Sequence, residues 1–275
     1  MAAGTPLKEW DVHINYGIKT GLNDAFIIDS ATRDALIAAD PKSAEIIRPI
    51  LRGRDIKRYE YSSPELWLLY VPWHFPIEDD NSIVGASERA EQLFQDQYPA
   101  VYAHLVSYKE KLFERNKAET GIRYEWYALQ RWGANYRDDF SKQKIVWGNL
   151  SLSAQYAWVS TDYIINNPAN FIVNGDLYLL GVLNSKVADF YIRSLGVTRN
   201  GGYFEYKPMF VEKLPVPQLQ ENEKKVFSEL VSEILKLKGS GIDSSKLESQ
   251  LDELVFDLYR LSESERFFLR DRSNL

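Results

Sequence analysis

The chain has 275 residues, of which 45% are hydrophobic and 13% aromatic, enough to bury a core in one large domain or two smaller ones. Lys and Arg number 33 against 39 Asp and Glu, so nucleic-acid binding would depend on where the cations lie and not on the net charge of −6. The sequence has no Cys, three widely spaced His and no apolar run of about 18 residues, which excludes a disulfide scaffold and leaves little for a zinc site or a membrane span. We expect no membrane partner, no bound metal and a cytoplasmic location.

Residues 11–29 alternate between apolar and polar side chains before a short apolar run. This pattern predicts two short strands around a turn that contains Gly17 and Gly21. The turn also carries Lys19, Thr20 and Asn23, which can face a ligand there, although Asn is also an ordinary turn residue. Residues 32–39 then predict a short helix, capped by a Ser or Thr at its start.

Residues 47–61 hold the densest group of cations in the chain, namely Arg48, Arg52, Arg54, Lys57 and Arg58. Arg presents a planar fork of donors and Lys a point charge, and both suit phosphate oxygens. We therefore predict a phosphate-binding stretch; the alternative is a strand and turn whose charges are merely solvated. Asp55 and Lys57 also match the carboxylate-x-Lys half of a metal-dependent nuclease site, but the preceding Pro-Asp half is missing.

The middle of the chain predicts a buried strand at residues 67–71, helices at 87–94 and 99–115, and paired strands at 144–150 and 156–160. Between them, residues 124–136 are rich in aromatic side chains and lie among Arg123, Arg131 and Arg137. Aromatic residues beside Arg can stack on bases, but they mostly fill cores, and we favour the core for the rings. Arg131 and Arg137 remain candidates for contacts with nucleic acid.

Residues 176–195 predict one strong helix, and a polar loop follows it. The loop contains Arg199, Asn200 and Tyr203 beside Gly201-Gly202, and a Gly-rich loop can approach a DNA groove closely or can be a simple turn. Leu214-Pro-Val-Pro217 cannot continue a helix or a central strand, so we place a boundary near residue 218.

The C-terminal segment has two apolar stripes at helical spacing, separated by Gly239-Ser-Gly241. Two such stripes predict an antiparallel helical hairpin, and Ser245 with Glu248 and Ser262 with Glu265 have the spacing of capping boxes. The expected architecture is α+β: a recognition domain over residues 1–218, followed by a helical hairpin over residues 219–275 that serves as a spacer or a docking segment.

Motifs for catalysis are missing. The sequence has no GxxxxGK[ST], no GxGxxG after a strand, no nucleophile elbow and no HExxH. We expect no catalytic residues and no cofactor in this chain.

Several segments together resemble the TaqI-like C-terminal specificity domain, the target-recognition part of N6-adenine DNA methyltransferases, including fused type II restriction-modification enzymes and phage-defence methyltransferases. The order and spacing of the segments also agree with that family, although the family's cofactor-binding and catalytic segments are absent here. The segments are Ile18–Ile27, Arg48–Tyr59, Leu183–Ser185, Gly201–Pro208, Leu214–Pro217 and the closing Leu251–Leu261.

The resemblance implies a module that recognises a specific site in double-stranded DNA for a catalytic methyltransferase part of the same parent protein. That parent would use S-adenosylmethionine to methylate adenine N6, and a restriction endonuclease activity is open. Two alternatives remain: a protein-interaction module of the same defence system, and a nuclease that uses Asp55 and Lys57. The expected DNA-binding residues are Lys19, Thr20, Asn23, Arg48, Arg52, Arg54, Lys57, Arg58, Arg131, Arg137, Arg199, Asn200 and Tyr203.

Overall fold

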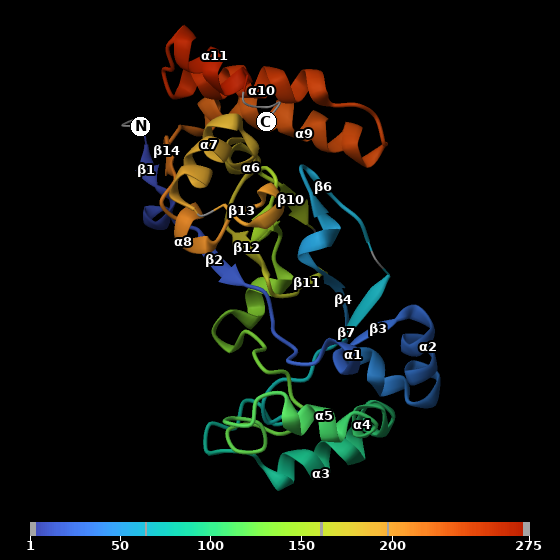
Figure 1. Ribbon diagram of the computed structural model, residues 1–275. Helices are drawn as coiled ribbons and strands as arrows, with labels where there is room; N and C mark the ends of the chain where they lie inside the picture. Colours follow the sequence, from blue (N-terminus) through green and yellow to red (C-terminus); the bar gives the residue numbers. More distant parts are fainter. Residues whose placement is uncertain (1–3, 64, 160–161, 197, 272–275) are drawn as a thin grey trace.

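The computed structural model describes residues 4–63, 65–159, 162–196 and 198–271. Helices gather at the two ends of the molecule, and sheets lie between them (Figure 1). One end holds α3 (Glu88–Gln97), α4 (Pro99–Val106) and α5 (Lys109–Glu114); the other holds α9 (Glu221–Gly239), α10 (Ser245–Leu258) and α11 (Glu263–Asp271). The predicted α+β class with C-terminal helices is confirmed.

The first sheet is antiparallel and has the order β10-β8-β12-β2. Its strands are β2 (His13–Tyr16), β8 (Lys144–Gly148), β10 (Tyr156–Val159) and β12 (Ala169–Val173), so the predicted pair of strands around residues 144–160 is confirmed. Val146 and Phe171 face one hydrophobic core, whereas Ile145 and Ile172 face the other. Because both faces are covered, β8 and β12 have almost continuously apolar sequences and do not alternate.

The second sheet has the order β11-β4-β7-β3, in which β11 is parallel to β4 and the other pairs are antiparallel. Its strands are β3 (Ile27–Asp29), β4 (Ile47–Leu51), β7 (Leu66–Leu69) and β11 (Ile164–Ile165). The strands predicted within residues 11–29 are β2 and β3, but they belong to different sheets. The turn between them contains α1 (Asn23–Phe26), and α2 (Ser30–Ala39) follows β3 with Asp29 as its cap.

Smaller elements connect these sheets. Three two-stranded ribbons pair β1 (Thr5–Pro6) with β14 (Pro215–Val216), β9 (Leu150–Ser151) with β13 (Phe204–Glu205), and β5 (Ile56–Lys57) with β6 (Glu60–Tyr61). The short helices are η1 (Leu7–Glu9), η2 (Pro41–Glu45), η3 (Gly53–Asp55), η4 (Ala134–Ser141), η5 (Asn200–Gly202) and α8 (Pro208–Val211).

Two helices predicted as continuous are each divided. Residues 176–195 form α6 (Leu177–Asn184) and α7 (Lys186–Leu195), because Ser185 is extended and its hydroxyl accepts a hydrogen bond from the Ala188 N–H. The Asn184 amide exchanges hydrogen bonds with the backbone of Tyr156 on β10, which fixes the end of α6 to the first sheet. Residues 99–115 form α4 and α5, separated at Ser107 and Tyr108.

Helix α9 packs on α6, α10 packs on α9 and α7, and α11 packs on α7; these helices share a hydrophobic core with the first sheet. Gly181 of α6 is the point of closest approach: a Cβ there would lie 2.9 Å from Val231 of α9 and 3.3 Å from Leu251 of α10. Any larger residue at this position would push these helices apart. The division of the chain at residue 218 remains a prediction.

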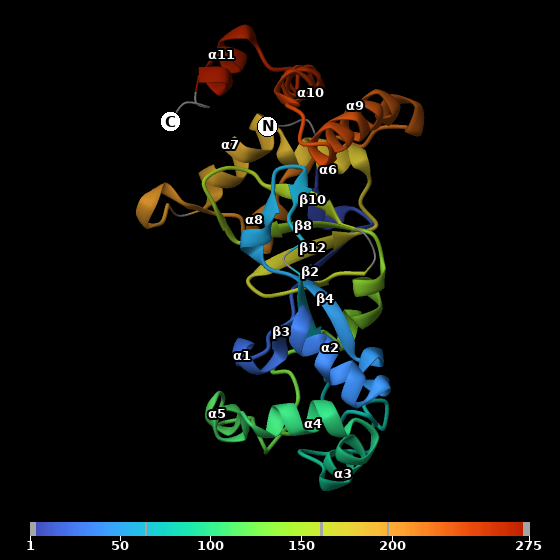
Figure 2. The ribbon, with the colours of Figure 1, turned by 90° about the vertical axis from the view of Figure 1, so that its right-hand side faces the viewer.

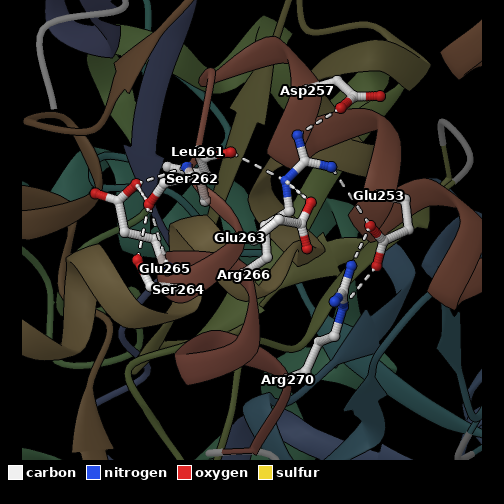
Figure 3. Close-up of polar contacts among 9 residues, drawn as sticks. All are labelled: Glu253, Asp257, Leu261, Ser262, Glu263, Ser264, Glu265, Arg266 and Arg270. Carbon is white, nitrogen blue, oxygen red and sulfur yellow. Dashed lines mark hydrogen bonds and ion pairs between the residues drawn. The ribbon is translucent and has the colours of Figure 1, made fainter.

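The start of α11 follows the predicted capping box. Ser262 N–H and its hydroxyl both donate to the Glu265 carboxylate, and the Glu265 N–H donates back to the Ser262 hydroxyl (Figure 3). Arg266 and Arg270 bind Asp257 and Glu253 of α10, which fixes α11 against its neighbour. The box predicted for Ser245 and Glu248 is wrong, because Glu248 binds other partners, described below.

Candidate nucleic-acid interface

The second sheet continues beyond β11 through the backbone of residues 17–19. Ile18 N–H donates to Ile165 at 2.8 Å, and Asn167 N–H donates to Ile18 at 2.8 Å, so this segment runs parallel to β11. Because β4, β11 and residues 17–19 all run the same way, their carboxyl ends meet at one edge. That edge carries η3, the Asn166-Asn167 turn and the turn that begins at Lys19.

Lys19 and Arg131 lie directly opposite one another at this edge. Lys19 N–H donates to the Arg131 carbonyl at 2.8 Å and Arg131 N–H donates to the Lys19 carbonyl at 2.9 Å. Residues that exchange both hydrogen bonds in an antiparallel pair have Cα atoms about 5.5 Å apart and side chains on the same face. Both side chains are exposed, and neither forms an ion pair within the described part of the chain. The fold thus brings together two cations that are 112 positions apart in sequence.

The partly buried side chain of Arg115 links the turn after Lys19 to the segment that precedes Arg131. Its guanidinium donates to the carbonyls of Thr20 (2.5 Å) and Trp126 (2.9 Å), and also to that of Ala128. The stem of Arg115 also packs against Gly21, which has a φ of +79° and whose Cβ would lie 2.7 Å from Arg115 Cδ. Burial lowers the pKa of Arg115 to about 10, so the side chain still carries its charge at neutral pH.

The three residues predicted in this turn, Lys19, Thr20 and Asn23, differ in burial. Thr20 is buried and its hydroxyl donates to the Asn23 side chain at 2.7 Å, whereas Asn23 itself is exposed at the start of α1. Thr20 therefore shapes the turn, while Lys19 and Asn23 present their side chains to solvent. Arg115 stands at the end of the helix predicted over residues 99–115, and its side chain turns inward to the backbone carbonyls described above.

The cations of residues 48–58 do not form one continuous strip. Arg52 is bound by Asp55 through Nε at 2.9 Å and Nη2 at 2.8 Å, and Arg48 donates to the carbonyls of Ala44 and Ile47. Arg54 in η3 is exposed and, within the described residues, has no ion pair. Lys57 is exposed and lies 3.9 Å from Glu60.

Arg58 joins the β5–β6 ribbon to the C-terminal helices. Its Nε donates to Glu248 of α10 at 2.6 Å, and Lys238 of α9 lies 3.3 Å from the same carboxylate. Burial alone would raise the pKa of Glu248, but Arg58, the hydroxyl of Ser244 and Lys238 outweigh it and the pKa is lowered. This charged group, formed by residues 190 positions apart, holds the ribbon against the hairpin.

The loop of residues 199–203 projects from the far end of α7. Arg199 Nε donates at 2.6 Å to Glu205, a buried carboxylate that also binds Lys207 at 2.9 Å. Hydrogen bonds from Lys207 and Arg199 lower the pKa of Glu205. Asn200 and Tyr203 are exposed, and the described residues give the Asn200 side chain no hydrogen-bond partner.

The aromatic segment fills the core, as the sequence favoured. Tyr124, Trp126 and Tyr127 are buried, and Trp73 stacks on Tyr124 with ring centroids 4.6 Å apart. Arg137 is exposed but is bound by Asp79 at 3.0 Å. Arg131 joins the edge described above through its backbone pairing with Lys19.

We give the name edge surface to the exposed candidates on the segments around the carboxyl edge of the second sheet, namely Lys19 and its partner Arg131, Arg54 in η3 and Asn23 at the start of α1. In Figure 2, α1 and the orange loop between α7 and β13 both lie toward the left, α1 in the lower half of the molecule and the loop in the upper half beside α8.

Other kinds of site have less support in these residues. Both oxygens of Asp55 accept hydrogen bonds from Arg52, so this carboxylate orients an arginine and is not open to a metal ion. Among the described residues, no group of three or more His, Asp or Glu side chains has an arrangement that would hold a metal. No helix in the described ranges is long and apolar enough to cross a membrane.

Comparisons with known proteins give the family and the fold of the chain. A type II methyltransferase of Methanocaldococcus jannaschii, M.MjaIV, is 23% identical over 255 residues, which cover 88% of this chain and 77% of that protein. The type IIL restriction-modification enzyme MmeI, solved in complex with DNA, has a similar fold (TM-score 0.67, 16% identity) over 94% of this chain and 34% of its own.

The type IIG restriction endonuclease BpuSI also matches, with a TM-score of 0.52 and 16% identity, over 94% of this chain and 31% of its own. This chain thus spans about a third of the length of each of these two solved enzymes. The model of the TaqI-like C-terminal specificity domain matches residues 48–216, more than half of the chain, from β4 through β14. The chain belongs to the family of TaqI-like C-terminal specificity domains.

Proposed function

We propose that this chain is the module that recognises a specific site in duplex DNA for an adenine-specific DNA methyltransferase or a type II restriction-modification enzyme. The observation that carries the proposal is that Lys19, Arg54 and Arg131 of the edge surface are exposed and have no carboxylate partner among the described residues, with Lys19 directly opposite Arg131. Exposed cations grouped on one side can bind a phosphate backbone even when the net charge is negative.

The relatives supply the enzyme class for this proposal. They are a type II methyltransferase and two restriction-modification enzymes, and one of the latter was solved with DNA. The missing catalytic part of the parent protein would bind S-adenosylmethionine, which supplies the methyl group, and would receive the flipped adenine. This chain alone is expected to show no methylation.

Within the module, the residues divide into two roles. Arg54, Lys19 and Arg131 would contact phosphates and so fix the position of the duplex, which carries no sequence information by itself. Asn23 and the 199–203 loop present amide, hydroxyl and guanidinium groups that can bind base edges. Arg52 would act indirectly, because Asp55 binds two of its guanidinium nitrogens. Arg58 lies outside the edge surface, where its Nε is bound by Glu248.

Arg54→Ala is expected to weaken binding to matched and mismatched duplexes alike and to lower the slope of log affinity against log salt by about one unit. The reason is that Arg54 has no partner within the described residues to compete with a phosphate. Fluorescence anisotropy with a labelled duplex over 50–300 mM NaCl measures both quantities. Arg33→Ala is the control, because Arg33 is bound by Asp34 on α2.

An unchanged salt slope for Arg54→Ala would contradict the predicted phosphate contact and would favour the alternative, in which the charges of residues 48–58 are merely solvated. If the whole chain shows no duplex binding at low salt, the protein-interaction alternative replaces the proposal. Mg²⁺-dependent cleavage of duplex DNA by the isolated chain would restore the nuclease alternative.

The role of the 199–203 loop in base recognition is tested by the preference of the protein for a matched over a mismatched duplex, and not by its overall affinity for DNA. Asn200→Ala is expected to lower the preference for the matched over a mismatched duplex by roughly 1–3 kcal/mol at one base pair, as the loss of a base contact does. Asn200 is the sharper probe, because Arg199→Ala also removes a partner of the buried Glu205. Equal discrimination by wild type and Asn200→Ala would remove this loop from the recognition surface.

A further inference from the structure

A cleft of about 760 Å³ opens between the 199–203 loop, α7 and α11, outside the edge surface. Three cations line it: Arg58 from the β5–β6 ribbon, and Lys186 and Arg193 from α7. An apolar wall faces them, to which Leu152, Phe190 and Leu269 contribute. The cleft thus combines positive charge with apolar surface, and none of its lining residues belongs to the edge surface.

The cations are held in place but keep unused hydrogen-bond donors. Arg58 uses only Nε, for Glu248, and Arg193 uses only Nη1, for Asp189 at 3.0 Å, so two guanidinium nitrogens of each have no partner within the described chain. Lys186 Nζ forms no ion pair among these residues, although its backbone N–H binds Asp252. An arginine that is anchored on one side by a carboxylate loses little entropy when an anion binds the other side.

The carboxylates around the cleft are already engaged. Asp189 accepts hydrogen bonds from the Ala154 N–H (2.7 Å), the Tyr206 hydroxyl (2.5 Å) and Arg193. Glu248 balances Arg58, and Asp252 accepts a hydrogen bond from the Lys186 backbone N–H. What the cleft offers a phosphate is therefore the unused N–H donors of Arg58, Lys186 and Arg193, and not a large excess of positive charge.

The 199–203 loop closes one side of the cleft without side chains. Gly201 and Gly202 both line it and both have a φ of +79°, a left-handed conformation that glycine adopts at little cost. Because neither carries a Cβ, a ligand can approach the backbone there. Arg193 Cζ also lies 3.8 Å from the centre of the Phe204 ring, a cation–π contact that restrains the guanidinium within the cleft.

We propose that this cleft is a second phosphate-binding site, which holds one nucleotide unit. The phosphate would bind Arg58, Lys186 and Arg193, and the sugar and base would lie against Leu152, Phe190 and Leu269. The nucleotide has two sources: the flank of a DNA duplex bound at the edge surface, or a free nucleotide. The first source rests on the proposed function, and the second does not.

Lys186→Gln in the full chain tests the site, because it removes the one cation with no internal carboxylate partner. With a duplex long enough to extend beyond the recognised site, the variant is expected to lower the salt slope by about one unit, whereas a minimal duplex gives equal slopes. Lys186→Arg is expected to restore the slope. Lys225→Gln on the exposed face of α9 is the matched control and is expected to change neither.

Protection of Lys186 from acetylation, followed by mass spectrometry, identifies the source. Protection by the long duplex assigns the cleft to flanking DNA, and protection by adenosine monophosphate in the absence of DNA assigns it to a free nucleotide; either supports the site. If neither protects Lys186 and the slopes are equal, the proposal is overturned. A chain that binds no DNA would still be tested by adenosine monophosphate, so failure of the cleft and failure of the proposed function are distinguishable.

Discussion

Arg115→Met is expected to lower the free energy of unfolding by about 3 kcal/mol or more, although the residue lies outside the predicted DNA-binding set. Methionine keeps the unbranched stem that packs on Gly21, but it leaves the carbonyls of Thr20, Trp126 and Ala128 without their donor. Each hydrogen bond from a charged donor contributes roughly 1.5–3 kcal/mol, and an unsatisfied buried acceptor costs about as much. Urea denaturation measures the change.

The position of Arg115 predicts a local effect as well as a global one. The amides of Lys19 and Arg131 bond to each other across the edge that Arg115 supports, so their hydrogen exchange should become faster than that of β8 in the first sheet. Arg89→Met on α3 is the control: Arg89 is largely exposed and lies 3.7 Å from Asp80, so its loss should cost less than about 1 kcal/mol. Equal stability of Arg115→Met and wild type would contradict this account and indicate that water satisfies the three carbonyls.

The sequence predicted the elements that depend on local pattern. The α+β class, the strand pair around β8 and β10 and the helices after residue 219 follow from the pattern of apolar residues. In the helices, the side chains that are buried recur with the helical period, and the two strands are short, mainly apolar runs. The breaks at Ser185 and at Ser107–Tyr108 were not predicted, since the apolar pattern runs through both. At Ser185 a side chain caps the second helix, which periodicity does not register.

The candidate site was predicted less completely, because its geometry depends on pairings between distant segments. The group of cations at residues 48–58 was visible in the sequence, yet the partner that occupies Arg58 is Glu248. The carboxylate that binds Arg52 belongs to Asp55, three positions later, and this short spacing was the one signal in the sequence that Arg52 would be paired. The pairing of Lys19 with Arg131 had no local signal, because it arises only when residues 17–19 extend the second sheet.

Arg115 and Lys186 show why charge in a sequence does not indicate role. Both lie in helical segments among other charged residues, where a solvated face is the ordinary interpretation. Arg115 instead turns under the edge surface, and Lys186 lines a cleft that α11, more than 75 positions later, helps to form. Fold and family could therefore be predicted from the sequence, whereas the division of cations into paired and exposed sets required the tertiary structure.

The double variant Lys19→Gln/Arg131→Gln is expected to lower the salt slope of duplex binding by about two units, and each single variant by about one. If affinities converge at 1 M salt, a difference of two units weakens binding roughly 100-fold at 0.1 M. Both glutamines keep the backbone hydrogen bonds between the two residues, so the edge of the sheet should be retained. Circular dichroism and urea denaturation establish that the fold is unchanged.

Lys246→Gln/Arg260→Gln is the matched control for this double variant. It removes the same charge from two exposed cations at the start of α10 and just beyond its end, which form no ion pair within the described residues and lie outside the edge surface. If the edge surface binds phosphates, the control should lower affinity only through the change in net charge and should leave the slope almost unchanged. Equal loss of slope in both double variants would mean that the protein attracts DNA through its total charge, and the pairing of Lys19 with Arg131 would then have no special role in recognition.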